Sequence, residues 1–218
     1  MHNGTIAVLN FDDWWEMEGE WVEPPNRRRG GFSGVIRTTV NNDVVYIKRM
    51  ENHLCHTLRH PFGIPTIMRE IDAINHLHPK GVVVPEIIFG DAIRQNGQWR
   101  SLLVTKEMKN FLSLEDWYKT DAWKNVDESA YDKILKEIAL AFRKMHLQKR
   151  QHGSCYARHV FIHWENDIKA GFIDLEHSRR RLTCAQAKNH DFTQFGKKLS
   201  VMPRKDWEKV LAWYEQLA

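Results

Sequence analysis

The residues best suited to chemistry lie in two short segments near the end of the chain, 152–159 and 171–176. The second segment begins as an apolar run and reaches Asp174. A carboxylate at the end of a buried strand suits Mg²⁺, which binds one or two carboxylates together with substrate phosphates. An isolated Ile-Asp-Leu is more commonly a turn at a strand end, so the metal interpretation depends on its neighbours. The chemistry it indicates is phosphoryl transfer.

The first segment, His152–His159, has the spacing of a kinase catalytic loop. In kinases this loop supplies an aspartate that accepts the substrate hydroxyl proton and, five residues later, an asparagine that holds metal. Here Ser154 and His159 have that five-residue separation, and Asp174 follows twenty residues after Ser154. The two segments therefore predict a kinase-like site with a serine at the position of the base.

Upstream residues fit the same interpretation. Gly30, Gly31 and Gly34 form a glycine-rich turn between two expected strands, and such a turn lets the backbone approach phosphates. A tight hairpin turn would use the same residues. Lys48 ends an apolar strand and Glu70 lies on the helix that follows, which is the order in which kinases place a phosphate-binding lysine and the glutamate that holds it.

The elements that must position these residues divide the chain into two halves. The first half is expected to contain a short helix within 11–22 that ends before Pro24-Pro25, strands at 35–40 and 44–48 around a turn at 41–43, a helix from Pro65 to Leu77, and strands near 87–92 and 99–105 joined by Asn96-Gly97. The second half is expected to contain helices at 112–123 and 128–148, short strands at 160–163 and 171–174, and two closing helices. This pattern predicts an α+β fold, with an antiparallel sheet and one helix in an N-lobe (1–108) and a compact, mainly helical C-lobe (109–218).

Composition limits the class of protein. The chain has 218 residues, of which 42% are apolar and 28% charged, as in a soluble globular protein. No apolar run approaches the roughly 18 residues that span a bilayer, and the N-terminus lacks the basic start and apolar core of a secretory signal. Cys55, Cys155 and Cys184 are widely spaced, which argues against a disulfide framework. We therefore expect a cytoplasmic protein.

The net charge of +4 is unevenly placed, because residues 27–29 and 179–181 are each three consecutive arginines. A guanidinium group binds phosphate bidentately, so these runs suit anionic ligands. A solvated basic face is the alternative. No recognition-helix or RNP-type motif accompanies the runs, so nucleic acid is not expected as a partner.

Together these segments resemble the InaA branch of the lipopolysaccharide kinase family, small bacterial relatives of protein kinases and RIO kinases. The resemblance extends from about Trp14 to the C-terminus and is carried best by residues 28–35, 104–108, 151–159, 172–182 and 190–192. It implies a two-lobed protein-kinase-like fold that uses ATP and Mg²⁺. It also implies a nucleotide-dependent phosphotransferase whose acceptor is a sugar of the lipopolysaccharide core or a related polar molecule.

The resemblance gives several residues a role in nucleotide binding. Lys48 would be the phosphate-binding lysine and Glu70 its partner. Glu107 and Met108 would form the hinge that contacts adenine.

In the second half, the resemblance makes Asp174 the metal-binding aspartate. His159 stands where many kinases have asparagine, although imidazole is a poor ligand for Mg²⁺ and hydrogen bonding is its alternative role. Asp191 would be the helix aspartate that steadies the catalytic loop.

Ser154 departs from the family pattern. A serine hydroxyl cannot act as a general base near neutral pH. Phosphoryl transfer depends mainly on positioning and charge stabilisation, so loss of the base need not abolish it. His152, Glu176 or a water could take the proton instead.

Two functions stay open. The first is an active ATP-dependent kinase, for which Arg179, Arg180 and Arg181 beside the metal segment suit an anionic acceptor or, at most, a peripheral contact with the inner membrane. The second is a pseudokinase that lacks the catalytic aspartate and binds nucleotide or a partner as a stress-response regulator.

Overall fold

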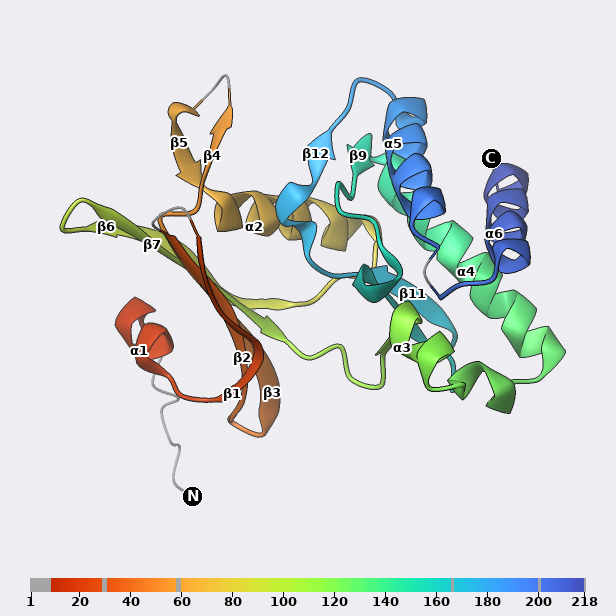
Figure 1. Ribbon diagram of the computed structural model, residues 1–218, viewed down its shortest axis with the longest axis horizontal. Helices are drawn as coiled ribbons and strands as arrows, with labels where there is room; N and C mark the ends of the chain where they lie inside the picture. Colours follow the sequence, from red (N-terminus) through yellow and green to blue (C-terminus); the bar gives the residue numbers. More distant parts are fainter. Residues whose placement is uncertain (1–8, 29–30, 58–59, 166, 200, 218) are drawn as a thin grey trace. The chain divides into compact units, whose positions relative to one another are not determined.

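The computed structural model describes residues 9–28, 31–57, 60–165, 167–199 and 201–217 (Figure 1). Internal contacts divide the chain into two compact units, Met1–Ile71 with Glu86–Glu107 and Asp72–Pro85 with Met108–Ala218. The predicted boundary between residues 108 and 109 stays a prediction. Residues 72–85, which precede that boundary in the chain, group with the second unit.

The first unit is built on a five-stranded antiparallel sheet in the order β1-β2-β3-β7-β6. Its strands are β1 (Glu20–Arg28), β2 (Gly31–Val40), β3 (Asp43–Glu51), β6 (Ile87–Gln95) and β7 (Gln98–Lys106). Asn41, Asn42 and Asn96 have positive φ angles of 51°, 67° and 51°, as tight hairpin turns require. The two hairpins predicted from the turn residues are therefore confirmed.

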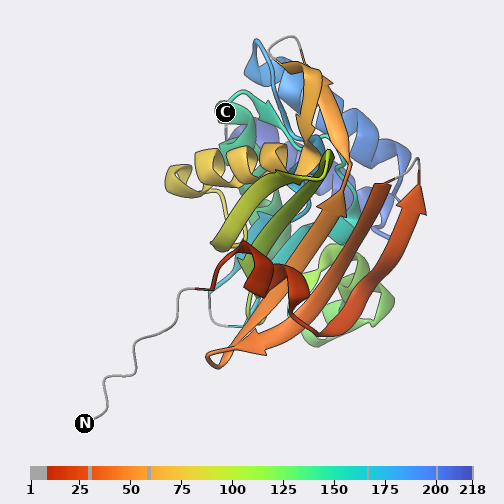
Figure 2. The same cartoon turned by 90° about the vertical axis from the view of Figure 1, so that its left-hand side faces the viewer.

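Helix α1 (Phe11–Glu16) lies across this sheet, as Figure 2 shows. It begins at a capping box, in which the Asn10 side chain accepts the Asp13 N–H at 3.0 Å and the Asp13 carboxylate accepts the Asn10 N–H at 2.8 Å. Phe11 and Trp14 pack into the core of this unit together with Ile36, Val45, Ile47, Leu102 and Val104.

The prediction of one helix across residues 11–22 is wrong for its second half. The helix ends at Glu16, and β1 begins at Glu20 and continues through Pro24 and Pro25. Proline is tolerated in a strand at the edge of a sheet, where its missing N–H leaves no ladder bond unmade. The pairing of β1 with β2 is irregular between Glu23 and Asn26, around the two prolines.

A histidine-rich segment forms a further pair of strands that was not predicted. Strands β4 (Leu54–Thr57) and β5 (His60–Pro65) pair antiparallel. The predicted helix follows directly as α2 (Thr66–Leu77). Both the N–H and the hydroxyl of Thr66 donate to the carbonyl of His53, at 2.8 and 3.1 Å, which fixes the entry to the helix.

The second unit is organised around α4 (Glu128–Leu147), against which α5 (Cys184–Lys197) and α6 (Arg204–Gln216) pack (Figure 1). Phe142 of α4 lies at the centre of an aromatic cluster that contains Phe172, Phe192, Phe195 and Trp207. The long helix and the two closing helices were predicted. No helix within the described ranges is both long enough and apolar enough to cross a membrane.

Short strands connect these helices. Strand β10 (Val160–His163) pairs with β8 (Leu112–Ser113) and β11 (Lys169–Phe172), and β9 (Arg150–Gln151) pairs with β12 (Arg179–Arg180). Ser113 caps α3 (Leu114–Lys119) as predicted, accepting the Asp116 N–H at 3.0 Å. The strand predicted at 171–174 ends earlier, at Phe172, so Asp174 lies outside it and precedes the short 3-10 helix Leu175–His177.

Candidate active site

The loop after α4 is held by one fully buried carboxylate, Asp191 of α5. Its oxygens accept the N–H of His152 at 2.7 Å and the N–H of Gly153 at 3.2 Å. The rings of His146 and His190 lie 3.2 and 3.1 Å from the same carboxylate. Burial alone would raise the pKa of Asp191, but the hydrogen bonds from His146 and His190 outweigh it, so the pKa lies well below its usual range. An ionised carboxylate therefore fixes the first two residues of the loop.

Gln194 supports the same loop from the next turn of α5. Its Oε1 accepts the Cys155 N–H at 2.5 Å and its Nε2 donates to the Gly153 carbonyl at 3.2 Å. Asp191 and Gln194 are three residues apart, so they share one face of the helix. Gln194 was not predicted, and its three-residue spacing from Asp191 is the signal in the sequence that points to it.

The backbone of the loop requires glycine at position 153. Gly153 has φ of +88°, and a Cβ there would lie 2.1 Å from the carbonyl oxygen of His177. A larger residue could not keep the loop against the segment that follows Asp174.

His152 is fully buried, and both of its ring nitrogens have partners. Nε2 lies 3.1 Å from the carbonyl of Ile173, which can only accept, so Nε2 carries the hydrogen and Nδ1 accepts the Ser154 N–H at 3.3 Å. Burial lowers the pKa of His152 to about 4. A neutral ring whose lone pair is already engaged is poorly placed to act as a base. The His152 ring thus contacts Ile173, the neighbour of Asp174, and its predicted catalytic role stays a prediction.

Ser154 is half-buried in the middle of the loop, and its backbone links the two histidines. Its N–H donates to His152, and its carbonyl accepts from Nδ1 of His159 at 2.7 Å. This conformation places a hydroxyl, and no carboxylate, at the position where a kinase base is expected.

His159 and Asp174, the two predicted metal ligands, lie side by side. Nε2 of His159 is 3.3 Å from Oδ2 of Asp174, and Nε of Arg158 donates to the same Nε2 at 3.0 Å. Asp174 adopts a left-handed backbone conformation, with φ and ψ both 58°. Such conformations cost about 1 kcal/mol for a non-glycine residue and are concentrated at functional sites. The pair could share one ion, because adjacent ligands of octahedral Mg²⁺ are about 3 Å apart.

Glu176, the other predicted proton acceptor, lies in the 3-10 helix that follows Asp174. Its side chain is 21% exposed and lies 3.3 Å from Nε2 of His177. Its part in catalysis stays a prediction.

In the first unit, the predicted lysine and glutamate form an ion pair. Nζ of Lys48 lies 2.8 Å from Oε2 of Glu70, and the two side chains are 15% and 6% exposed. Lys48 is not at the end of its strand as predicted, because β3 continues to Glu51 and Lys48 pairs with Val35 and Leu103 on either side. A lysine in the middle of a central strand is held more firmly than one at a strand end.

The predicted adenine hinge has some of its backbone groups already engaged. The Glu107 N–H donates to the Val44 carbonyl at 2.9 Å, and the Met108 carbonyl accepts the Phe111 N–H at 3.0 Å. The Glu107 side chain is paired with Arg37 at 3.1 Å. Adenine contacts through this segment would have to use its other backbone groups.

The predicted glycine-rich turn is wrong for Gly31 and Gly34, which both lie inside β2. Gly30 falls outside the described residues. A Cβ on Gly34 would approach the Trp21 ring to 2.7 Å, and one on Gly31 would approach the Glu51 carbonyl to 2.7 Å. Close cross-strand packing thus accounts for both glycines, and a contact with phosphate stays a prediction.

Residues 12–214 match the sequence profile of the Lipopolysaccharide kinase (Kdo/WaaP) family. The chain belongs to this family.

Individual relatives align over different lengths. Protein InaA of Escherichia coli (strain K12) is 50% identical over 204 residues, which cover 94% of this chain and 94% of that protein. Lipopolysaccharide core heptose(I) kinase WaaP of Escherichia coli is 28% identical over 122 residues, which cover 52% of this chain and 45% of WaaP. The resemblance to the InaA branch is therefore confirmed.

The structure of WaaP in complex with acyl carrier protein matches with a TM-score of 0.70 and 20% identity, over 94% of this chain and 82% of that chain. At this identity the likeness shows the fold alone. It confirms the predicted α+β, two-lobed protein-kinase-like fold.

Proposed function

We propose that this chain binds Mg²⁺-ATP in the cytoplasm and transfers the γ-phosphoryl group to a sugar of the lipopolysaccharide core or a related polar acceptor. The observation that carries the proposal is the geometry around Asp174. The Asp174 backbone is in a left-handed conformation and its carboxylate lies beside His159, next to a loop that a buried ionised Asp191 fixes in place.

The donor set is suited to a hard divalent cation. Asp174 would supply the carboxylate oxygen that Mg²⁺ prefers, and the substrate phosphates would supply others. His159 would either orient Asp174 or occupy one coordination position of the ion. The ion would neutralise charge on the transferred phosphoryl group, which is the main catalytic requirement of this reaction.

Lys48 would bind the nucleotide phosphates, with Glu70 holding its ammonium group in place. Both side chains are largely buried, so their orientation is constrained before ATP binds. Preorganised charge of this kind contributes more to phosphoryl transfer than a mobile surface lysine would.

Catalysis would proceed without a carboxylate base in the loop. Ser154 cannot take a proton near neutral pH, and both nitrogens of the His152 ring are engaged. The acceptor proton would therefore pass to Glu176 or to water. Because the transition state of phosphoryl transfer is largely dissociative, this proton moves late and its acceptor matters less than the placement of charge.

The acceptor class comes from the relatives. WaaP, which aligns with about half of this chain, is a lipopolysaccharide core heptose(I) kinase. The exposed arginines Arg179, Arg180 and Arg181 would suit an anionic acceptor of that kind.

Ser154 favours one second candidate, a pseudokinase that binds nucleotide or a partner and acts as a stress-response regulator. A loop fixed as firmly as this one could hold nucleotide without turning it over.

Transfer of labelled phosphate from ATP to a purified lipopolysaccharide core oligosaccharide separates the two candidates. We expect the wild type and Ser154→Ala to transfer phosphate at similar rates and Asp174→Asn to lose at least about a hundredfold in rate, since loss of a transition-state charge partner costs about 3 kcal/mol. Ser154→Asp is the matched gain-of-base variant. Activity that appears only in Ser154→Asp would support the pseudokinase and contradict the kinase.

A further inference from the structure

The surface around β12 and the start of α5 combines exposed cations with exposed leucines. Leu182 is 81% exposed and Leu147 is 52% exposed, and both rank among the most exposed large apolar side chains of the described residues. Lys149, Arg180 and Arg181 beside them are also exposed. We call these five residues the basic-leucine patch.

Hydrogen bonds connect the two segments that carry the patch. The Arg181 N–H donates to the Lys149 carbonyl at 2.7 Å, and Sγ of Cys184 lies 3.9 Å from the Leu147 carbonyl. Strand β12 pairs with β9, so the segment that carries the arginines is tied to the one after α4. Hydrogen bonds and strand pairing therefore hold the backbone near the two exposed leucines in place.

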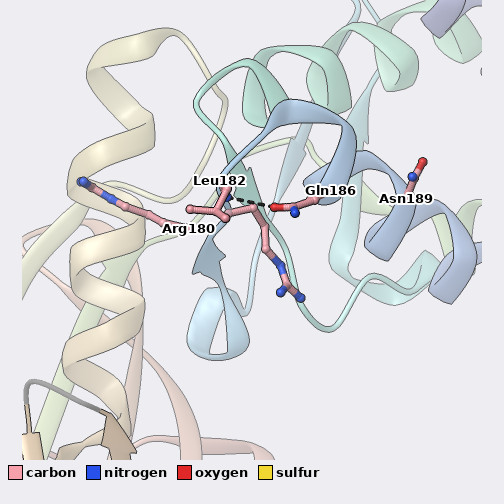
Figure 3. Close-up of a pocket in the computed structure, with 5 residues that line it drawn as sticks. Arg180, Leu182, Gln186 and Asn189 are labelled. Atoms are coloured by element: carbon pink, nitrogen blue, oxygen red, sulfur yellow. Dashed lines mark hydrogen bonds between the residues drawn. The ribbon is translucent and has the colours of Figure 1, made fainter.

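Figure 3 shows part of the patch, where a pocket is lined by Arg180, Arg181, Leu182, Gln186 and Asn189. The Leu182 N–H donates to Oε1 of Gln186 at 3.0 Å, which fixes the backbone at the most exposed leucine. The Arg180 side chain extends away from Gln186 and Asn189, toward His76, 3.4 Å from its ring. The pocket thus combines one highly exposed leucine with the side chains of arginine, glutamine and asparagine.

We infer that the basic-leucine patch docks on an anionic lipid surface. An exposed leucine alone is common on protein surfaces. Leucines flanked by cations match the composition of interfacial membrane-binding surfaces, where apolar groups enter the acyl boundary and Lys or Arg pair with lipid phosphates. A free phosphate or a nucleic acid would engage the cations but gain nothing from Leu182 and Leu147, so the leucines favour a lipid.

The basic-leucine patch lies close to the loop of the candidate active site. The Arg181 guanidinium donates to the Gln151 side chain, and Gln151 immediately precedes His152 of the loop. A lipid-linked acceptor held at the patch would lie near the loop that carries Ser154. The docking itself does not depend on phosphoryl transfer.

Binding to sedimented vesicles tests the inference. We expect the protein to bind vesicles of phosphatidylethanolamine with phosphatidylglycerol and to bind phosphatidylcholine vesicles at least about tenfold more weakly, because each cation near an anionic surface is worth about fivefold in affinity. Arg180→Gln and Leu182→Ser should each lower the partition coefficient about fivefold. Arg204→Gln and Val22→Ser, which remove an exposed cation and an exposed apolar side chain elsewhere, should leave it unchanged.

Equal binding to both kinds of vesicle would overturn the inference. So would loss of binding in Arg180→Gln with none in Leu182→Ser, because that result describes general polyanion binding. ATP titrations on the same variants keep this test separate from the proposed kinase function. Loss of vesicle binding with ATP binding retained would overturn the docking alone. Loss of ATP binding with vesicle binding retained would overturn the kinase function alone.

Discussion

Acidification should destabilise the protein through His152. Its pKa is 6.5 in an unfolded chain and about 4 in the folded protein, because burial disfavours the charged ring. Between these values the unfolded state binds more protons, so stability falls as pH decreases through this window and this contribution levels off below pH 4. From the two pKa values, lowering the pH from 7 to 5 should cost about 2 kcal/mol through this ring alone.

Urea unfolding at a series of pH values between 7 and 5 measures this loss. His152→Gln keeps a donor for the Ile173 carbonyl but does not titrate, so its pH dependence should be smaller than that of the wild type by about 2 kcal/mol. His78→Gln, at an exposed position, is the matched control and should retain the full dependence. If His152→Gln and the wild type lose stability equally with falling pH, or if the His152 ring titrates above pH 6 by NMR, the reasoning is refuted.

Three further changes test the loop by equilibrium unfolding. Gly153→Ala should destabilise the protein by at least about 2 kcal/mol more than Gly81→Ala, because both glycines have positive φ but only at Gly153 does a Cβ meet a carbonyl, that of His177; equal effects would contradict this. Asp191→Asn should cost about 3 kcal/mol, since an amide nitrogen replaces one acceptor of a buried charge, and a cost below about 1 kcal/mol would show that the carboxylate does not hold the loop. Gln194→Ala should cost about 1–2 kcal/mol and leave the Cys155 N–H and the loop more open to hydrogen exchange; unchanged exchange would argue against its role.

Local rules predicted most of the fold because the local signals and the tertiary contacts agree. The Asn-rich turns at 41–42 and 96 produced the hairpins that they favour, and Ser113 caps its helix. The prediction failed at residues 17–22 because the spacing of Trp14 and Trp21 also suits a helix. Edge pairing with β2 decides that segment, and pairing between strands is not visible in a local pattern.

The candidate site, like the fold, could be predicted from the sequence only in part. The spacing of Ser154, His159 and Asp174 could be read from the sequence, and so could the chain order of Lys48 and Glu70. The roles of buried groups could not. The choice between base and structural residue for His152 depends on which lone pair is engaged and on how deeply the ring is buried, and both depend on packing.

The most direct test of the central claim is calorimetric titration of ATP with and without Mg²⁺. We predict that the wild type binds ATP in the presence of Mg²⁺, that Asp174→Asn loses the Mg²⁺ dependence, and that Lys48→Met binds at least about tenfold more weakly, as expected for loss of a charge-assisted contact worth about 1.5 kcal/mol. Arg204→Gln, which removes an exposed cation of α6, should bind ATP as the wild type does. Failure of the wild type to bind ATP under any of these conditions, with the protein folded, would contradict the account.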